Sequence, residues 1–134
     1  MSFIAIDHTH PDHHKHTEFA TLEEAQTFVE TNLPNGFAAP HPGGNSEFWI
    51  VDKVNKKVSF DQKAYDANTF NENMIILRQE RDRRLVATDI TVLPDRWESM
   101  NNDSKTAWSV YRQALRDLPA NTPDPTNITW PTKP

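Results

Sequence analysis

The apolar and polar positions of the first seventy residues predict several short elements. A run of apolar residues at 3–6 predicts a strand. Thr21 and Glu24 have the spacing of a capping box ahead of apolar positions at helical spacing, so we expect a helix at about residues 21–32. All three glycines and two prolines fall in residues 36–44, and this segment predicts a loop without regular structure.

Two runs rich in β-forming residues follow, at residues 48–51 and 58–60. The polar segment between them is long enough for a turn, in which Asn55 suits a left-handed backbone conformation. Together with residues 3–6, the two runs predict a small antiparallel sheet. We therefore expect residues 1–70 to form an N-terminal module with a small antiparallel sheet or hairpin and one helix.

The pattern becomes helical in the second half of the chain. Residues 72–87 contain neither glycine nor proline and consist largely of good helix formers, which predicts a long helix. Asn102 or Asp103 can cap a second helix, which the pair Leu118–Pro119 is expected to end. One face of this second helix carries apolar residues at helical spacing, namely Ala107, Trp108, Tyr111, Leu115 and Leu118. The two helices together predict a helical hairpin.

Prolines are concentrated at the end of the chain. Residues 119–134 contain five prolines and no glycine, which predicts an extended, stiff arm that docks elsewhere. Trp130 can fill the groove between the two helices or anchor the arm to a neighbouring subunit, and packing is the favoured interpretation. The predicted fold is therefore α+β, with a small module at residues 1–70 and a helical-hairpin module with its arm at residues 71–134.

Composition argues against several functions. The net charge of −5 is unlike that of a general nucleic-acid binder, and the absence of cysteine excludes disulfides and thiol nucleophiles. No stretch approaches the roughly 20 apolar residues that a membrane helix needs. No catalytic triad or phosphate-binding glycine loop is recognisable. We therefore expect a cytoplasmic, non-enzymatic protein without a cofactor, which binds proteins rather than nucleic acid or membranes.

Five of the six histidines are concentrated between residues 7 and 18. Imidazole and carboxylate groups are ligands for first-row metals, and the candidate ligands here are His8, His10, His13 and His14. No matching ligand motif follows in the rest of the chain, so a solvated polar loop is the favoured interpretation. A structural or adventitious divalent metal is the alternative, and a metal-dependent enzyme is a less favoured third reading.

Arginines mark both predicted helices of the second module. Acidic residues interrupt the arginine-rich run at residues 78–84, so a solvated or ion-paired helix face is favoured over a nucleic-acid contact. Arg112 and Arg116 lie one turn apart on the second helix. Each can pair with Asp89 or Asp95 in the link between the helices, or with a partner protein.

Four sequence blocks follow one another in the C-terminal two fifths of the chain. They are Arg78 to Asp89, Leu93-Pro94-Asp95, Trp108 to Pro119, and the pair Trp130-Pro131. In their order and spacing, these blocks resemble the phage tail assembly chaperone family. The resemblance implies a protein that acts in the host cytoplasm, in tail or tail-fibre assembly, by binding another tail protein. It implies no catalytic residues.

A permanent structural component of the virion tail, baseplate or fibre attachment is the alternative function. Both functions predict other phage tail proteins as partners, and they leave homo-oligomer formation open. The residues predicted to bind a partner or to form the core of the helical module are Arg81, Arg84, Trp108, Tyr111, Arg112, Leu115, Arg116, Asp117 and Trp130.

Overall fold

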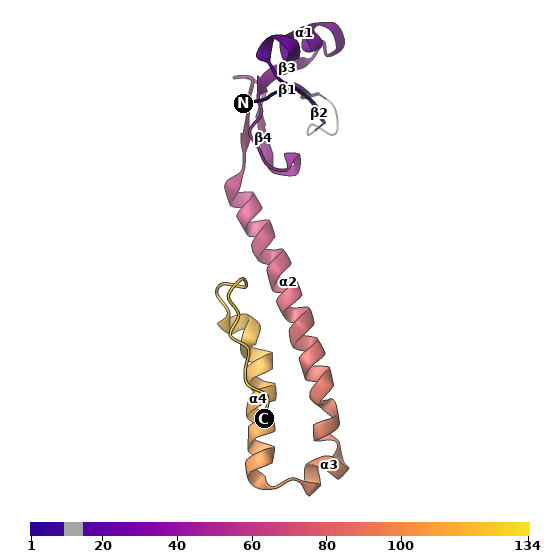
Figure 1. Cartoon of the computed structure of the whole chain (residues 1–134), viewed down its shortest axis with the longest axis vertical. Coiled ribbons are helices and arrows are strands. Elements are labelled where there is room, and N and C mark those ends of the chain that lie inside the picture. Colours follow the sequence, from indigo (N-terminus) through magenta and orange to yellow (C-terminus); the bar gives the residue numbers. More distant parts are fainter. Residues whose placement is uncertain (10–14) are drawn as a thin grey trace. The chain divides into compact units, whose positions relative to one another are not determined.

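The computed structural model describes residues 1–9 and 15–134. The chain divides into two compact units, Met1–Asp66 and Ala67–Pro134, which are described separately below. Two small antiparallel sheets lie in the first unit, and helices make up most of the second (Figure 1). The α+β class predicted from the sequence is confirmed. In the described part of the chain, no helix is both long enough and apolar enough to span a membrane.

The first unit is built on a three-stranded antiparallel sheet. Its strands are β1 (Phe3–Asp7), β2 (His16–Phe19) and β3 (Gly36–Pro40), in the order β2-β1-β3. The central position of β1 explains why Ile4 and Ile6 have no exposed surface. The strand predicted at residues 3–6 is therefore confirmed, and it forms the centre of the sheet.

One face of this sheet carries the core of the unit. In the register of β1 and β3, Ile4 lies opposite Ala39 and Ile6 lies opposite Phe37. Residues directly opposite each other share a face, so these four side chains form one apolar layer. Trp49 completes this cluster from a neighbouring hairpin and is 5% exposed.

The helix α1 (Leu22–Asn32) lies against the sheet and has the predicted capping box. The hydroxyl of Thr21 accepts a hydrogen bond from the N–H of Glu24 at 3.2 Å, and the Glu24 carboxylate accepts one from the N–H of Thr21. Ala25 is fully buried, and Ala5 of β1 is almost fully buried. Such small side chains allow a helix and a sheet to approach closely.

A 3₁₀ turn, η1 (Ser46–Phe48), leads into the hairpin of β4 (Trp49–Asp52) and β5 (Lys57–Phe60). The predicted hairpin is confirmed, but it forms its own two-stranded sheet instead of joining β1. Its turn places Lys56, with a φ of 52°, in the left-handed region, and not Asn55 as predicted. The side-chain amide of Asn55 instead donates a 2.8 Å hydrogen bond to the carboxylate that ends β4.

The prediction of a loop at residues 36–44 is wrong for the first half of this segment, because β3 forms there. A Cβ at Gly36 would lie 2.8 Å from the carbonyl oxygen of Ile6, so this glycine is needed for the close approach of β3 to β1. The strand β2 was also not predicted. Its sequence has no apolar alternation, and pairing with β1 alone makes it a strand.

The second unit contains the two predicted long helices and two shorter elements. These are α2 (Gln62–Thr88), the 3₁₀ turn η2 (Asp89–Val92), α3 (Pro94–Ser99) and α4 (Asn102–Asn121). The start of α2 falls in the first unit, and its remaining turns belong to the second. Residues 122–134 have neither helix nor strand.

Both long helices extend beyond their predicted limits. The carboxylate of Asp61 accepts a 3.0 Å hydrogen bond from the N–H of Ala64, and this cap explains why α2 begins well before residue 72. At α4 the cap is Asn101, one residue earlier than predicted. The expected stop at Pro119 is wrong: the helix continues to Asn121, and the hydroxyl of Thr122 bonds to the carbonyl of Leu118 at 2.7 Å.

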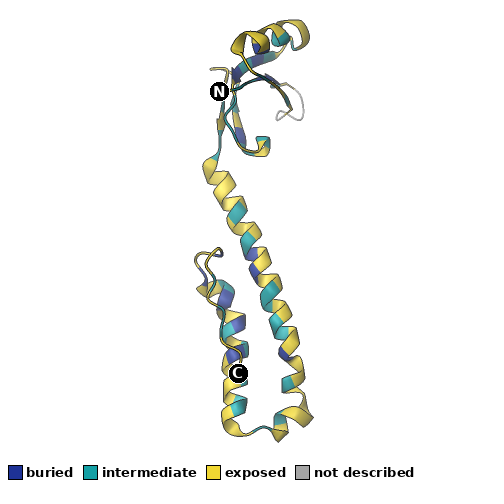
Figure 2. Ribbon diagram, viewed as in Figure 1, coloured by how far each residue is buried: buried dark blue, intermediate teal, exposed yellow. Residues whose placement is uncertain are grey.

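The core of the second unit is narrow. Met74 and Leu77 of α2 pack with Leu118 of α4, and Ile128 and Trp130 from the C-terminal segment pack against them. Figure 2 shows how much of both helices is exposed outside this cluster. The prediction that the arm docks elsewhere is therefore wrong, because its two large apolar side chains lie within the unit.

The apolar face predicted for the second helix is confirmed in its C-terminal half. Tyr111, Leu115 and Leu118 are buried on α4. Trp108 is half-buried and contacts the ring of Tyr111 edge-on, with centroids 6.1 Å apart. Ala107 is exposed, so the buried face begins one turn later than its sequence pattern indicated.

Candidate functional site

Arg112 of α4 reaches the C-terminal end of α2 and binds three groups there. Its guanidinium donates to the carbonyl oxygen of Leu85 at 3.1 Å and to the hydroxyl of Thr88, and it lies 2.9 Å from the carboxylate of Asp89. We call these four residues the Arg112 cluster. The last carbonyl groups of a helix lack partners within the helix and attract cations, so Arg112 stabilises this end of α2.

Thr88 is the residue of the Arg112 cluster that sequence reasoning missed. It is 2% exposed, and its hydroxyl donates to the carbonyl of Leu85 at 2.8 Å while accepting from Arg112. A buried hydroxyl needs such partners, because burial without them costs free energy. The position of this threonine at a helix end, just before an aspartate, was the available signal.

A second arginine joins α2 to the C-terminal segment. The guanidinium carbon of Arg84 lies 4.0 Å from the centroid of the Trp130 ring, within the range of a cation–π interaction. The same side chain donates to Glu80 at 2.8 Å. Trp130 therefore has a packing role, which was the favoured interpretation from the sequence.

Most arginines of the run at residues 78–84 form ion pairs with acidic residues of α2 itself. Glu80 accepts two hydrogen bonds from Arg83, each 2.8 Å long, in addition to the one from Arg84. Arg81 lies 2.6 Å from the carboxylate of Asp82. The structure therefore favours an ion-paired helix face over a nucleic-acid contact, since these arginines already have anionic partners.

These hydrogen bonds make Glu80 a source of acid sensitivity. The bonds from Arg83 first, and then from Arg84, lower the pKa of Glu80 from its ordinary 4.5 to about 2. A carboxylate with a lowered pKa stabilises the fold above its ordinary pKa, and that contribution is lost as the pH falls toward the folded value. We therefore expect the second unit to lose stability as the pH falls from 4.5 to about 2.

The variant Glu80→Gln tests this acid sensitivity. The free energy of unfolding should depend less on pH in the variant than in the unchanged chain across this window. Asp52 and Asp124 also have lowered pKa values, caused first by hydrogen bonds from Asn55 and Thr126, so only the difference between the two curves reports on Glu80. The free energy of unfolding is measured by urea titration at a series of pH values. If it changes with pH in the same way in both proteins, Glu80 is not the source of the acid sensitivity.

The remaining predicted residues of the helical module do not form a single site. Tyr111 and Leu115 are core residues, whereas Arg116 and Asp117 are exposed on α4. Arg116 and Asp117 both bond to Gln113, at 3.5 and 3.0 Å. The predicted pairing of an α4 arginine with Asp89 or Asp95 is confirmed for Arg112 with Asp89.

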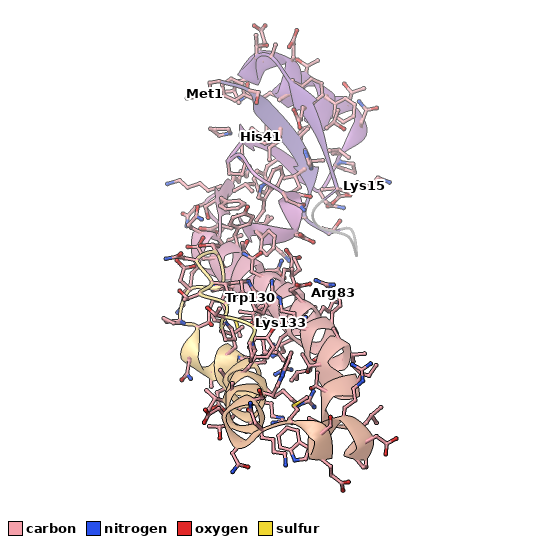
Figure 3. The ribbon with its side chains drawn as sticks, turned by 60° about the horizontal axis from the view of Figure 1, so that its bottom comes forward. Met1, Lys15, His41, Arg83, Trp130 and Lys133 are labelled. Atoms are coloured by element: carbon pink, nitrogen blue, oxygen red, sulfur yellow. The ribbon has the colours of Figure 1, made fainter. Side chains whose placement is uncertain are left out.

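A small cavity of about 260 Å³ adjoins the Arg112 cluster, and we call it the cationic notch. Thr88 and Tyr111 line it together with three cationic residues and two apolar ones; these are Arg83, Arg84, Lys133, Ala87 and Pro131. Figure 3 labels Arg83 and Lys133 there, with Trp130. The ammonium of Lys133 also lies 6.0 Å from the ring centroid of Trp108.

A larger cavity of about 510 Å³ lies between α4 and the C-terminal segment, and we call it the α4 groove. Its apolar lining includes Val110, Leu118 and Trp130. Val110 is 63% exposed although it sits on a helix with a buried face. The α4 groove and the cationic notch were not predicted from the sequence, because they form where the C-terminal segment folds back.

The histidine-rich segment of the first unit is only partly described. Residues His10, His13 and His14 of the predicted metal site lie outside the described residues. His8 is half-buried, its ring lies 5.9 Å from that of Phe37, and its Nδ1 is buried without a hydrogen-bond partner within residues 1–9 and 15–134.

The structure brings together two other histidines, which were not predicted as a pair. Nε2 of His16 and Nε2 of His41 lie 3.5 and 3.4 Å from the same carboxylate oxygen of Glu18. Both rings also contact Trp49, at centroid distances of 4.4 and 5.0 Å. Figure 3 labels His41. Two imidazoles and a carboxylate are a donor set suited to a divalent metal.

One hydrogen bond argues against a metal ion in this group. The N–H of Gly43 donates to Nδ1 of His41 at 2.9 Å, so the neutral ring carries its proton on Nε2, toward Glu18. A metal ion on Nε2 would displace that proton and leave neither ring nitrogen protonated, whereas a metal-bound histidine normally donates from its other nitrogen. The geometry favours a polar contact between β2 and the segment after β3, in which both imidazoles lie beside the Glu18 carboxylate.

Comparison with known proteins finds a similarity in the second unit. No curated protein and no solved structure matches the chain. Residues 74–134 match the model of the phage tail assembly chaperone protein family. The matched residues include the Arg112 cluster, the cationic notch and the α4 groove, and the first unit lies outside them. The resemblance seen in the sequence is thus confirmed: the C-terminal region of this chain matches the phage tail assembly chaperone family.

Proposed function

We propose that the second unit binds another phage tail protein during tail assembly. The family match over residues 74–134 is the observation that carries this proposal, because the family is described by its role in tail assembly. The contacts described above hold the second unit together: Arg112 joins α4 to Asp89 at the end of α2, and Arg84 contacts Trp130 of the C-terminal segment. A unit held in this way can present a fixed surface to a partner protein.

The α4 groove and the cationic notch are the proposed contact surfaces. Apolar side chains of a partner can enter the groove beside Val110, and a partner carboxylate can pair with Lys133 at the notch. Protein interfaces commonly combine an apolar centre with charged groups at the rim. The Arg112 cluster keeps these surfaces in place, because Arg112 fixes α4 to the end of α2.

Two exposed valines provide a matched test of this proposal. Val110 lines the α4 groove, whereas Val86 is 68% exposed on α2 and lines neither cavity. Co-purification of the tagged chain with tail proteins expressed from the same phage genome should fall about tenfold or more in Val110→Asp, the effect of removing a contact at the centre of an interface. Val86→Asp should leave it unchanged. An equal loss of co-purification in both variants, or no loss in either, would exclude the α4 groove as the binding surface.

Mass spectrometry of purified virions separates an assembly chaperone from the structural alternative. A chaperone leaves before the tail is complete, so the chain should be present in assembling cells and absent from finished tails. Its presence in finished tails at the level of other tail subunits would contradict the chaperone role and support a permanent component of the tail, baseplate or fibre attachment.

A further inference from the structure

The strand β2 lies at the outer edge of the three-stranded sheet. In the order β2-β1-β3, the strand β2 pairs with β1 on one side, and no strand of the described residues pairs with its other side. An edge strand presents unpaired N–H and C=O groups, onto which another extended chain can add. This edge lies in the part of the chain that the family match does not cover.

A groove of about 830 Å³ runs between this edge and α1. Phe19 of β2 and Phe28 of α1 line it, and their ring centroids lie 5.2 Å apart. Both rings are half-buried, so each keeps apolar surface available to a ligand.

The charged residues that line this groove are all acidic. No lysine or arginine occurs between His16 and Asp52, whereas the same segment contains several carboxylates. Three of them, Glu18, Glu23 and Glu24, line the groove. A partner that brings positive charge would therefore be attracted to the edge, and one that brings negative charge would be repelled.

The two faces of β2 carry different chemistry. In the register with β1, Phe19 lies opposite Phe3, and Glu18 lies opposite Ile4. Neighbouring residues of a strand point to opposite faces, so Phe19 points toward α1 and Glu18 points to the other face of the sheet. On the α1 side, a strand added beside β2 would meet the rings of Phe19 and Phe28, with Glu23 at the rim; on the other face it would meet Glu18.

We propose that this groove binds an extended basic segment of a partner protein, which adds to the free edge of β2. The segment alternates apolar and basic residues: the apolar ones pack against Phe19 and Phe28, and the basic ones approach Glu18. Glu23, on the rim of α1, attracts the same positive charge. This is a second binding surface, independent of the one proposed for the second unit.

Nuclear magnetic resonance of the labelled full chain tests the proposal. The probe is a short synthetic peptide in which lysine and valine alternate, and it should shift the backbone amide signal of Glu18, whose N–H points away from β1 in the alternation of an antiparallel ladder. A peptide of the same composition with all lysines placed before all valines has the same charge but lacks the alternation. Equal shifts from both peptides would overturn strand addition, because charge alone would then explain binding.

Two glutamates of α1 serve as matched variants. Glu23 lines the groove and Glu30 does not, although both are exposed. Glu23→Lys should weaken binding of the alternating peptide by about tenfold, the scale expected for reversing a charge at an interface, whereas Glu30→Lys should not. Circular dichroism establishes that both variants are folded. Equal weakening in the two variants would overturn the proposed location.

Two further outcomes would overturn the proposal. Absence of shifts at β2 with the alternating peptide would exclude the edge as a binding site for this chemistry. A shift of the Glu18 amide that depends on protein concentration, without peptide, would show that a second copy of the chain occupies the edge instead. Neither outcome affects the Val110 experiment, which concerns the second unit.

Discussion

Replacing Leu77 with alanine is expected to lower the free energy of unfolding of the second unit by about 3 kcal/mol, the usual scale for a buried leucine. Leu77 is 1% exposed and packs with Met74, Leu118 and both apolar residues of the C-terminal segment. The substitution leaves a cavity at the point where three parts of the chain meet. Urea titration followed by circular dichroism measures the loss.

The neighbouring Ile76 provides the control for this experiment. It lies on the same helix but is 61% exposed, so Ile76→Ala should change the free energy of unfolding by no more than about 0.5 kcal/mol. The fluorescence of Trp130 should change in Leu77→Ala, because its packing partner is lost. Similar losses of stability in the two variants would contradict the assignment of Leu77, and not Ile76, to the core of the second unit.

Replacing Arg112 with alanine is expected to cost about 2 to 3 kcal/mol, because hydrogen bonds from a charged donor are worth more than neutral ones. The side chain of Arg112 is 12% exposed, and its removal leaves the buried hydroxyl of Thr88 without its donor. The ion pair with Asp89 contributes less, since that carboxylate is 58% exposed. The loss is measured by urea titration of the full chain.

Arg116 is the matched control for Arg112. It lies one turn further along α4, is exposed, and bonds only weakly to Gln113 among the described residues, at 3.5 Å. Arg116→Ala should therefore leave stability within about 0.5 kcal/mol of the unchanged chain. Arg112→Lys should recover only part of the loss, because an ammonium group cannot reproduce the planar guanidinium geometry. Full recovery in the lysine variant would contradict the assigned hydrogen bonds.

Local patterns in the sequence predicted much of the fold. The capping box at Thr21 and Glu24, the apolar run that forms β1 and the buried face of α4 each depend on residues close together in the chain. The strands β2 and β3 could not be predicted in the same way. The first is polar and the second begins at a glycine, and both are strands because β1 lies between them.

The candidate site was predictable only in part. The sequence offered Asp89 and Asp95 as partners for the arginines of α4, and the structure contains the pair of Arg112 with Asp89. The contact of Arg84 with Trp130 could not be predicted, because it depends on how the C-terminal segment folds back. The group of His16, Glu18 and His41 likewise depends on the placement of β2 and the segment after β3.

The hydrogen bonds of Arg112 also bear on how long the second unit stays folded. They join residues 27 and 24 positions apart, whereas Glu80 bonds to arginines three and four positions away on the same helix. The local pairs can form as soon as α2 forms, but the bonds of Arg112 require that α4 has already docked. Contacts that form late in folding mainly slow unfolding. We therefore expect Arg112→Ala to shorten the lifetime of the docked helices, which unfolding kinetics measure directly.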